Sequence, residues 1–230
     1  MNKTVKIIIE VVLLAVIVFL TLTIVKSIQE PVDFNKQKAY RESVAIQRLK
    51  DIRDLQVAFR SVNGHFASTV DSLKLFYETG EMPVVLQIGS QDDSAAVAHT
   101  AAIKKANRRI TNEQLYERYL AGDKQLVFSI ENKIAVKDTL FNQREDFSID
   151  SLKTIPFSGG APVLMESAVK MVSGVPVPLF EAKMPYKTLL KGLDNQLRIN
   201  LDADRRDQNK YEGLQVGSIT APNNNAGNWE

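Results

Sequence analysis

The N-terminal part of the chain carries the clearest pattern, an uninterrupted apolar run. Residues 7–25 read IIIEVVLLAVIVFLTLTIV and hold a single charge, Glu10. At about 1.5 Å per residue, a helix of this length covers roughly 29 Å, close to the ~30 Å hydrocarbon core of a bilayer. The run therefore predicts one membrane-spanning helix. Its length, and the lack of an Ala-x-Ala cleavage site after Val25, favour an uncleaved anchor over a signal peptide.

The residues after this run predict a second helix, which is amphipathic. Pro31 is expected to kink or break the first helix, and residues 33–63 then contain neither glycine nor proline. Ile52, Leu55 and Phe59 recur at helical spacing and form an apolar stripe. Two interpretations of the stripe stay open: packing on the protein's own sheet, and packing against other copies of the chain.

The next segment predicts short mixed elements. Asn63–Gly64 is expected to end the amphipathic helix as a left-handed cap. A short helix or turn is expected at residues 71–77, a strand at 82–89 and helix-compatible sequence at 91–106. Thr111 predicts the N-cap of a further helix, because a glutamine stands three residues after it.

From residue 124 the chain changes to alternating β-branched, aromatic and polar residues, which is typical of strands. The expected strands cover residues 125–130, 133–141, 151–157, 175–182, 196–201 and 214–219. Glu131–Asn132 is expected as a tight turn, and 185–193 as a short helix. Residues 163–172 fit either a long strand or a helix. Two prolines in 175–182 favour a place at a sheet edge.

This order of elements predicts an α+β fold, because the strands do not alternate with helices as in a parallel sheet. We expect a long N-terminal helix, first transmembrane and then amphipathic, packed on an antiparallel sheet. Residues 1–30 would form the tip and the anchor, 31–220 the folded domain and 221–230 a flexible tail. The length allows one good core or two small ones. Lysine and arginine counts on the two sides of the span leave its orientation undecided.

The composition excludes several classes of function. The formal net charge is only +2 without a basic block, so nucleic acid is not an expected partner. The absence of cysteine excludes thiol catalysis, disulfides and thiolate metal sites. The two histidines, His65 and His99, are not part of an HExxH motif, and phosphate-binding and hydrolase motifs are missing. No catalytic residue and no cofactor are predicted.

Two weaker features remain as candidate sites. Asp202, Asp204 and Asp207 have acidic spacing that a calcium loop uses, although the glycine and bidentate glutamate of such a loop are missing. A solvated turn is the alternative. Trp229 is the single tryptophan and stands on the polar tail, where it would dock into a groove of a partner or remain an ordinary tail residue.

The first 80 residues resemble a type IV pilin or a type II secretion pseudopilin. The shared features are an apolar N-terminal helix with a glutamate near its start, here Glu10, its continuation into an amphipathic helix, and an Asn-Gly-x-aromatic turn at 63–66. The chain departs from the family at three points. Val5–Lys6 replaces the glycine of the prepilin peptidase site, no proline follows Phe66, and the cysteine pair common in pilin heads is missing.

The resemblance implies an inner-membrane protein of a bacterium with an extracytoplasmic, periplasmic head, and it implies assembly through the N-terminal helix. A carboxylate within hydrocarbon is costly unless it is paired. Glu10 is therefore expected to meet Lys3 or Lys6 of a neighbouring subunit, or to reach the water at the headgroups.

The expected function is a non-enzymatic, single-pass structural or assembly subunit of a bacterial envelope complex. Its expected partners are membrane lipid and protein subunits, either copies of itself or other proteins. Glu10, the two lysines and the apolar stripe would carry the assembly. The alternative is a membrane-tethered periplasmic enzyme or ligand-binding domain that uses the acidic group at 202–207.

Overall fold

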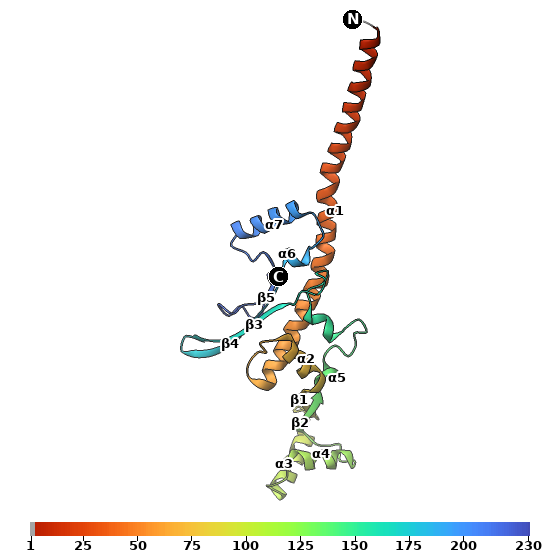
Figure 1. Cartoon of the computed structure of the whole chain (residues 1–230). Coiled ribbons are helices and arrows are strands. Elements are labelled where there is room, and N and C mark those ends of the chain that lie inside the picture. The colour runs from red at the N-terminus through yellow and green to blue at the C-terminus, as the bar shows by residue number, and fades with distance from the viewer. Residues whose placement is uncertain (1–2) are drawn as a thin grey trace.

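A computed structural model describes residues 3–230 and shows one very long helix with a folded head along its C-terminal half (Figure 1). Helix α1 (Lys3–Asn63) has 61 residues, about 92 Å at 1.5 Å per residue. It runs through Pro31 without ending, so of the two effects expected there, a kink or a break, the break is wrong. The proline removes one backbone donor, and the helix-favouring residues on both sides outweigh that loss.

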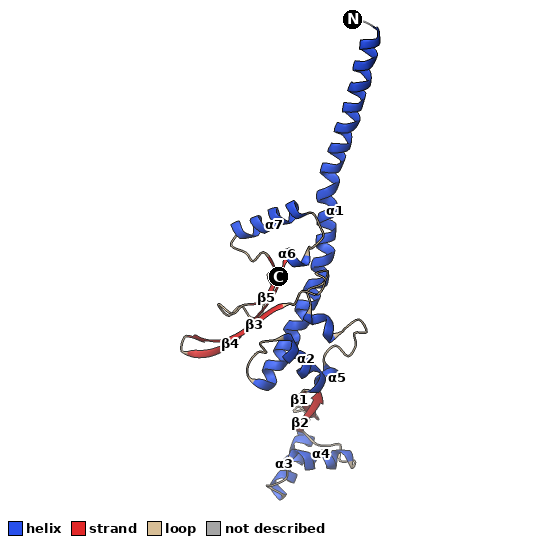
Figure 2. Cartoon of the chain, in the orientation of Figure 1, coloured by secondary structure: helices blue, strands red, loops and turns tan. Residues whose placement is uncertain are grey.

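The main body of the head packs on α1 from Phe34 onward. Its sheet is antiparallel with the order β3 (Leu164–Val172), β4 (Val175–Pro185), β5 (Gly213–Gly217). The remaining elements of this body are α2 (Val70–Thr79), α5 (Val136–Thr139), the 3₁₀ helix η1 (Ile149–Lys153), α6 (Tyr186–Leu189) and α7 (Asn195–Asp207). Figure 2 shows this mixture of helix and strand, which confirms the α+β class.

The main core lies between α1 and the three-stranded sheet. Ile52 and Leu55 of α1 are fully buried and belong to the same apolar cluster as Phe180, Ala182 and Met184 of β4. The stripe predicted on α1 therefore packs on the protein's own sheet. This result decides between the two interpretations that the sequence left open.

A second, smaller lobe lies at the end of the molecule away from the N-terminus (Figure 1). It consists of the two-stranded antiparallel sheet of β1 (Glu81–Ile88) and β2 (Phe128–Ala135) with helices α3 (Ser94–Ala106) and α4 (Asn112–Leu120). Its separate core contains Ile88, Leu115, Leu126, Phe128 and Ile130. The head thus has two small cores.

Local capping signals are confirmed. Gly64 has a φ of +76° and its N–H donates to the carbonyl of Arg60, so it ends α1 in the left-handed conformation. Thr111 accepts from the N–H of Gln114, whose side chain in turn accepts from the N–H of Thr111. This is the reciprocal cap that the sequence predicts for α4.

Several predicted strands are wrong. Residues 196–201 lie in helix α7, because Asp194 accepts from the N–H of Leu197 and caps a helix at that point. Residues 151–157 begin within η1 instead of a strand. Glu131–Asn132 is not a turn, because β2 runs through it in register with β1. The chain after Ala135 then forms α5. Residues 163–172, left open before, contain strand β3.

Candidate functional site

The first functional feature is the free part of α1, which projects from the head (Figure 1). Its large apolar side chains from Val11 to Val25 are exposed, with Leu14 66% and Phe19 68% exposed. The helix is long and apolar enough to cross a membrane, and none of its most apolar window is buried. A signal sequence near the N-terminus also satisfies these criteria, so the preference for an uncleaved anchor stays a prediction.

Glu10 lies on this exposed part of α1. The side chains of Lys3 and Lys6, its expected partners in a neighbouring subunit, fall outside the described side chains. The pairing of Glu10 thus stays a prediction.

The residues of the apolar stripe do not form a surface that is free for assembly. Ile52 and Leu55 are covered by the protein's own core. Phe59 is half-buried, and its ring meets the edge of Phe76 at 5.2 Å between centroids and that of His65 at 5.6 Å. These three residues hold the head on α1 and are occupied within one copy of the chain.

The second functional feature is the β3–β4 hairpin, which extends sideways beyond the sheet (Figure 1). Ser173 and Gly174 both have positive φ, 51° and 83°, and form the two-residue turn between paired Val172 and Val175. Positive φ at both central positions matches the turn that suits the twist of a hairpin. Val169 and Met171 are 62% and 67% exposed, so apolar side chains cover the projecting part.

The outer edge of β3 is open for hydrogen bonding. In a hairpin with a two-residue turn, the two residues that flank the turn, here Val172 and Val175, exchange hydrogen bonds. Every second residue of β3 before Val172 also exchanges hydrogen bonds with its partner on β4. The residues between them therefore direct their N–H and C=O groups away from β4. These outward residues are Met165, Ser167, Val169 and Met171. Within residues 3–230, no hydrogen bond reaches their backbone groups.

The protein's own chain already uses the start of this edge. The N–H of Val163 donates to the carbonyl of Lys153, and the N–H of Ile155 donates to the carbonyl of Ala161. Thr154 and Pro162 thus form an antiparallel bridge on the same side. The outer edge of β3 is therefore paired up to Val163 and open from Met165 onward. The segment around Thr154, which pairs with the start of this edge, ends before β3 does.

The opposite edge of the hairpin is blocked by proline. β5 pairs with β4 only along Glu181–Pro185, which leaves the outer half of β4 without a second neighbour. Pro176 and Pro178 stand on the positions of β4 that face this open side and supply no N–H there. The predicted edge character of the proline-bearing segment is therefore correct for its outer half, although β4 is the central strand. Only the β3 edge of the hairpin keeps its donors.

The charges on the open strand lack partners. Glu166 lies directly opposite Glu181 of β4. Glu181 is balanced by Lys183 and accepts from Nε2 of Gln215 at 2.8 Å. No ion pair within the described chain involves Glu166, so two like charges face one another across the strands, an arrangement that destabilises a sheet. Lys170, four residues further on, also forms no ion pair among the described residues.

The acidic group proposed as a calcium loop lies on helix α7. Asp202 is buried and bound to Arg198, and burial raises the pKa of its carboxyl. Asp204 and Asp207 lie two and five residues further along the helix and are exposed. A helix directs side chains at these offsets to different sides, so the three carboxylates do not converge. The described residues contain no group of three metal-binding side chains.

Trp229 lies against its own domain. It is half-buried beside the main core, and Gly227 pairs with Val216 of β5. Nε1 of Trp229 has no hydrogen-bond partner among the described residues. The neighbouring Glu230 forms an ion pair with Arg53 of α1 at 2.6 Å. The end of the chain thus contacts α1 and the sheet in one copy.

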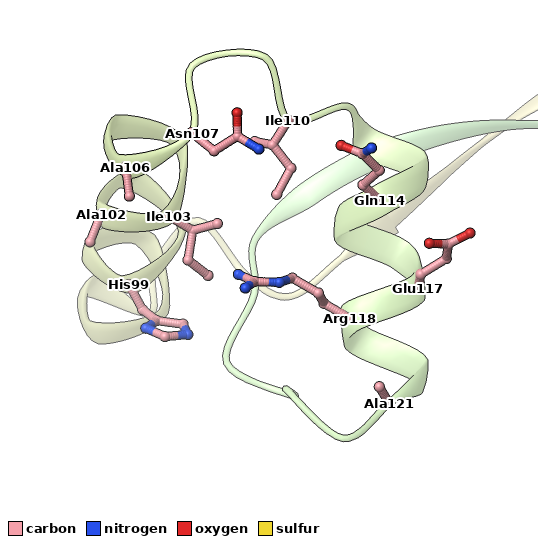
Figure 3. Close-up of a pocket in the computed structure, with 10 residues that line it drawn as sticks. All are labelled: His99, Ala102, Ile103, Ala106, Asn107, Ile110, Gln114, Glu117, Arg118 and Ala121. Carbon is pink, nitrogen blue, oxygen red and sulfur yellow. The ribbon is translucent and has the colours of Figure 1, made fainter.

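A shallow pocket of about 760 Å³ lies in the small lobe between α3 and α4 (Figure 3). Ile103 and Ile110 point into it, and the guanidinium of Arg118 extends toward its centre from the opposite helix. His99 lies at the rim and contacts the carboxylate of Asp123 at 3.1 Å. The pocket is wide and contains no arrangement of nucleophile, base and orienting group, which hydrolytic catalysis needs.

Sequence reasoning found the long apolar helix and missed the open edge of β3. The turn Ser173–Gly174 and the two prolines after it were visible in the sequence. They did not show which strand lies in the centre of the sheet, because that depends on pairing with the distant β5. Without the strand order, the sequence does not show which strand carries the free edge.

Comparison with known proteins finds no matching family model, no matching curated protein and no matching solved structure. In shape, the long apolar N-terminal helix packed on a small antiparallel sheet is loosely pilin-like. A functional assignment therefore depends on the geometry of α1 and of the β3–β4 hairpin.

Proposed function

We propose that this protein is a single-pass, membrane-anchored, pilin-like subunit that assembles with other proteins in a bacterial envelope complex, with its head in the periplasm. The observation that carries the proposal is the combination of two free surfaces in one molecule. One is the apolar part of α1, which the head leaves uncovered. The other is the open, apolar edge of β3.

The exposed part of α1 supports the anchor. An apolar surface of this size has no cover within the described chain, and water is a poor solvent for it. A bilayer supplies that cover over the length of residues 7–25. Lipid, and the helices of other subunits within it, are the partners that this segment fits.

The β3 edge supports assembly by strand addition. An extended segment of another protein would complete the outward hydrogen bonds of β3, the way many peptides bind a sheet edge. A basic residue opposite Glu166 and an acidic one opposite Lys170 would balance the unpaired charges. A shift of the added strand by one residue would move each of its side chains to the other face of the sheet. The charges of Glu166 and Lys170 therefore also select the register of the added strand.

A different protein fits this edge better than a second copy does. Two copies paired antiparallel through their own β3 strands in one sheet are related by a two-fold axis perpendicular to that sheet. Because α1 packs along a face of the same sheet, the axis reverses the direction of α1. The two anchors would then point in opposite directions, which one membrane does not accommodate.

Site-specific photocrosslinking from Met171 of the full chain in its native membrane tests the proposal. We expect one discrete adduct with a different protein. In that background Val169→Pro removes an outward N–H and leaves its partner carbonyl unpaired, at a cost of about 1–2 kcal/mol, so the adduct yield should fall about tenfold. Val169→Thr keeps the N–H and the branched side chain and serves as the matched control.

Three outcomes would count against this function. They are adducts with lipid alone, an adduct that Val169→Pro does not weaken, and an adduct between two copies of the chain. Thermal unfolding of both variants shows whether the hairpin still folds. Proline is tolerated in an edge strand, and β4 already contains two prolines on its free side.

A further inference from the structure

The position of α7 relative to the apolar segment of α1 defines a further surface. Figure 1 shows α7 as the part of the head nearest to the N-terminal half of α1, extending sideways from it. A cavity of about 380 Å³ joins the two helices near the start of α7. Its lining residues are Thr23, Lys26, Ser27, Glu30, Pro31, Asp194, Gln196 and Leu197.

These contacts set the height of α7 above the bilayer. Thr23 belongs to the apolar run, and Lys26, the first charge after it, forms an ion pair with Glu30 at 3.3 Å. Ser27 lies two residues past Val25, about 3 Å further along the helix axis. The start of α7 therefore lies at the level where hydrocarbon gives way to headgroups.

The structure holds α7 firmly in this place. Nη1 of Arg41 donates to the carbonyls of Leu189 at 3.1 Å and Lys191 at 2.8 Å, on the segment that leads into α7. Nη2 of Arg205 donates to Oη of Tyr186 at 2.8 Å, and Tyr186 in turn donates to Glu42 of α1. The C-terminal end of α7 is thus linked to α1 through Tyr186, and the segment that precedes α7 is linked to α1 through Arg41.

The exposed side chains on the first two turns of α7 are polar, with one apolar exception. Leu197 and Leu201 pack against the main core, and Ile199 lines a cavity that it shares with Pro185, Lys187 and Tyr211 of the head. Gln196, Ile199 and Asn200 lie exposed on the first two turns, with Ile199 43% exposed. Arg198, the only charged side chain inside these turns, is neutralised by Asp202.

We infer that the first half of α7 rests on the phospholipid headgroups. The Gln196 amide donates to Oδ1 of Asn200 at 2.9 Å, and in the lipid contact its second N–H and the amide of Asn200 donate to phosphate oxygens. The inference rests on the proposed membrane anchor. It adds a second contact between protein and lipid, which fixes the tilt of the head. Because Arg198 is paired with Asp202 and residues 194–201 contain no other basic side chain, the contact should not require anionic lipid.

Single-cysteine labelling tests this contact, since the chain contains no cysteine. A fluorophore is attached at Ile199→Cys, at Ser27→Cys as the reference for headgroup depth, and at Ala121→Cys in the small lobe as the distant control. The full chain is inserted into phosphatidylcholine vesicles that contain a lipid with a nitroxide on its headgroup. The same vesicles with phosphatidylglycerol added give the second series.

We expect the label at position 199 to lose fluorescence to the same extent as the label at 27, in both lipid mixtures, and the label at 121 to keep it. Quenching at 27 without quenching at 199 would overturn the contact of α7 and leave the anchor intact. No quenching at either position would contradict the anchor itself. Quenching at 199 only with phosphatidylglycerol would show that the contact requires anionic lipid and would refute the inference.

Discussion

At the scale of single residues, Tyr211 shows how the fold changes the chemistry of a side chain. It lies half-buried between α7 and β5, near Glu181 and Glu212. Burial, followed by the two carboxylates, raises the pKa of its phenol from 10.0 to about 12. Folding thus holds this hydroxyl in its neutral form at alkaline pH.

This shift predicts a loss of stability at high pH. Below pH 10 the phenol is protonated in both the folded and the unfolded chain. Between pH 10 and 12 the unfolded chain loses the proton first, so its ionisation favours unfolding by up to about 2 kcal/mol. Urea unfolding of the full chain in detergent micelles should show this decline, and Tyr211→Phe should make it smaller. Equal declines in the parent and the variant would refute the assignment.

Residue-scale features were also the most predictable ones. The cap at Thr111 and the left-handed Gly64 depend on residues within four positions along the chain, so the sequence contains the whole cause. The exposure of Glu10 follows in the same way from the uncovered run around it. The contact between Glu42 and Tyr186 does not, because the chain returns to α1 only after 144 residues.

At the scale of elements, the short helix α7 depends on its cap. Oδ1 of Asp194 accepts from the N–H of Leu197 at 2.8 Å, and this bond fixes the first turn. Its sequence also contains β-compatible Ile199 and Leu201, which is why residues 196–201 suggested a strand. The cap, together with the packing of Leu197 and Leu201 on the core, stabilises the helix over a strand.

Asp194→Ala is therefore expected to destabilise the head by about 1 kcal/mol, the usual cost of a lost N-cap. Asp194→Asn retains an acceptor at the same position and should keep most of the stability. Thermal unfolding of the two variants, read by the circular dichroism of the full chain, measures the difference. If both variants unfold at the same temperature as the parent, the cap does not hold α7.

Strand order was the part of the fold that the sequence did not contain. The alternation in β2 and β4 indicated strands, but the pairing partners lie far away in the chain. β2 pairs with β1, although α3 and α4 lie between them in the sequence. In this pairing Glu131 and Asn132 lie within β2 and do not form a turn. The open β3 edge follows from such pairings and became visible only with the structure.

At the scale of the whole molecule, α1 connects every proposed contact. Its N-terminal half offers an apolar surface to lipid, its middle places α7 beside the end of that surface, and its C-terminal half supports the sheet with the open β3 edge. The small lobe lies furthest from the membrane segment (Figure 1). In the proposed arrangement the head would stand directly on the bilayer and present β3 sideways to a partner.

The proposed function requires an anchor that stays attached to the head, and the state of the protein in cell membranes tests this directly. Membranes are washed with alkaline carbonate, and the protein that remains is analysed by intact mass spectrometry. We predict that the chain stays in the washed membrane and still carries residues 7–25. Recovery of the head in the soluble fraction, with those residues removed, would contradict the account.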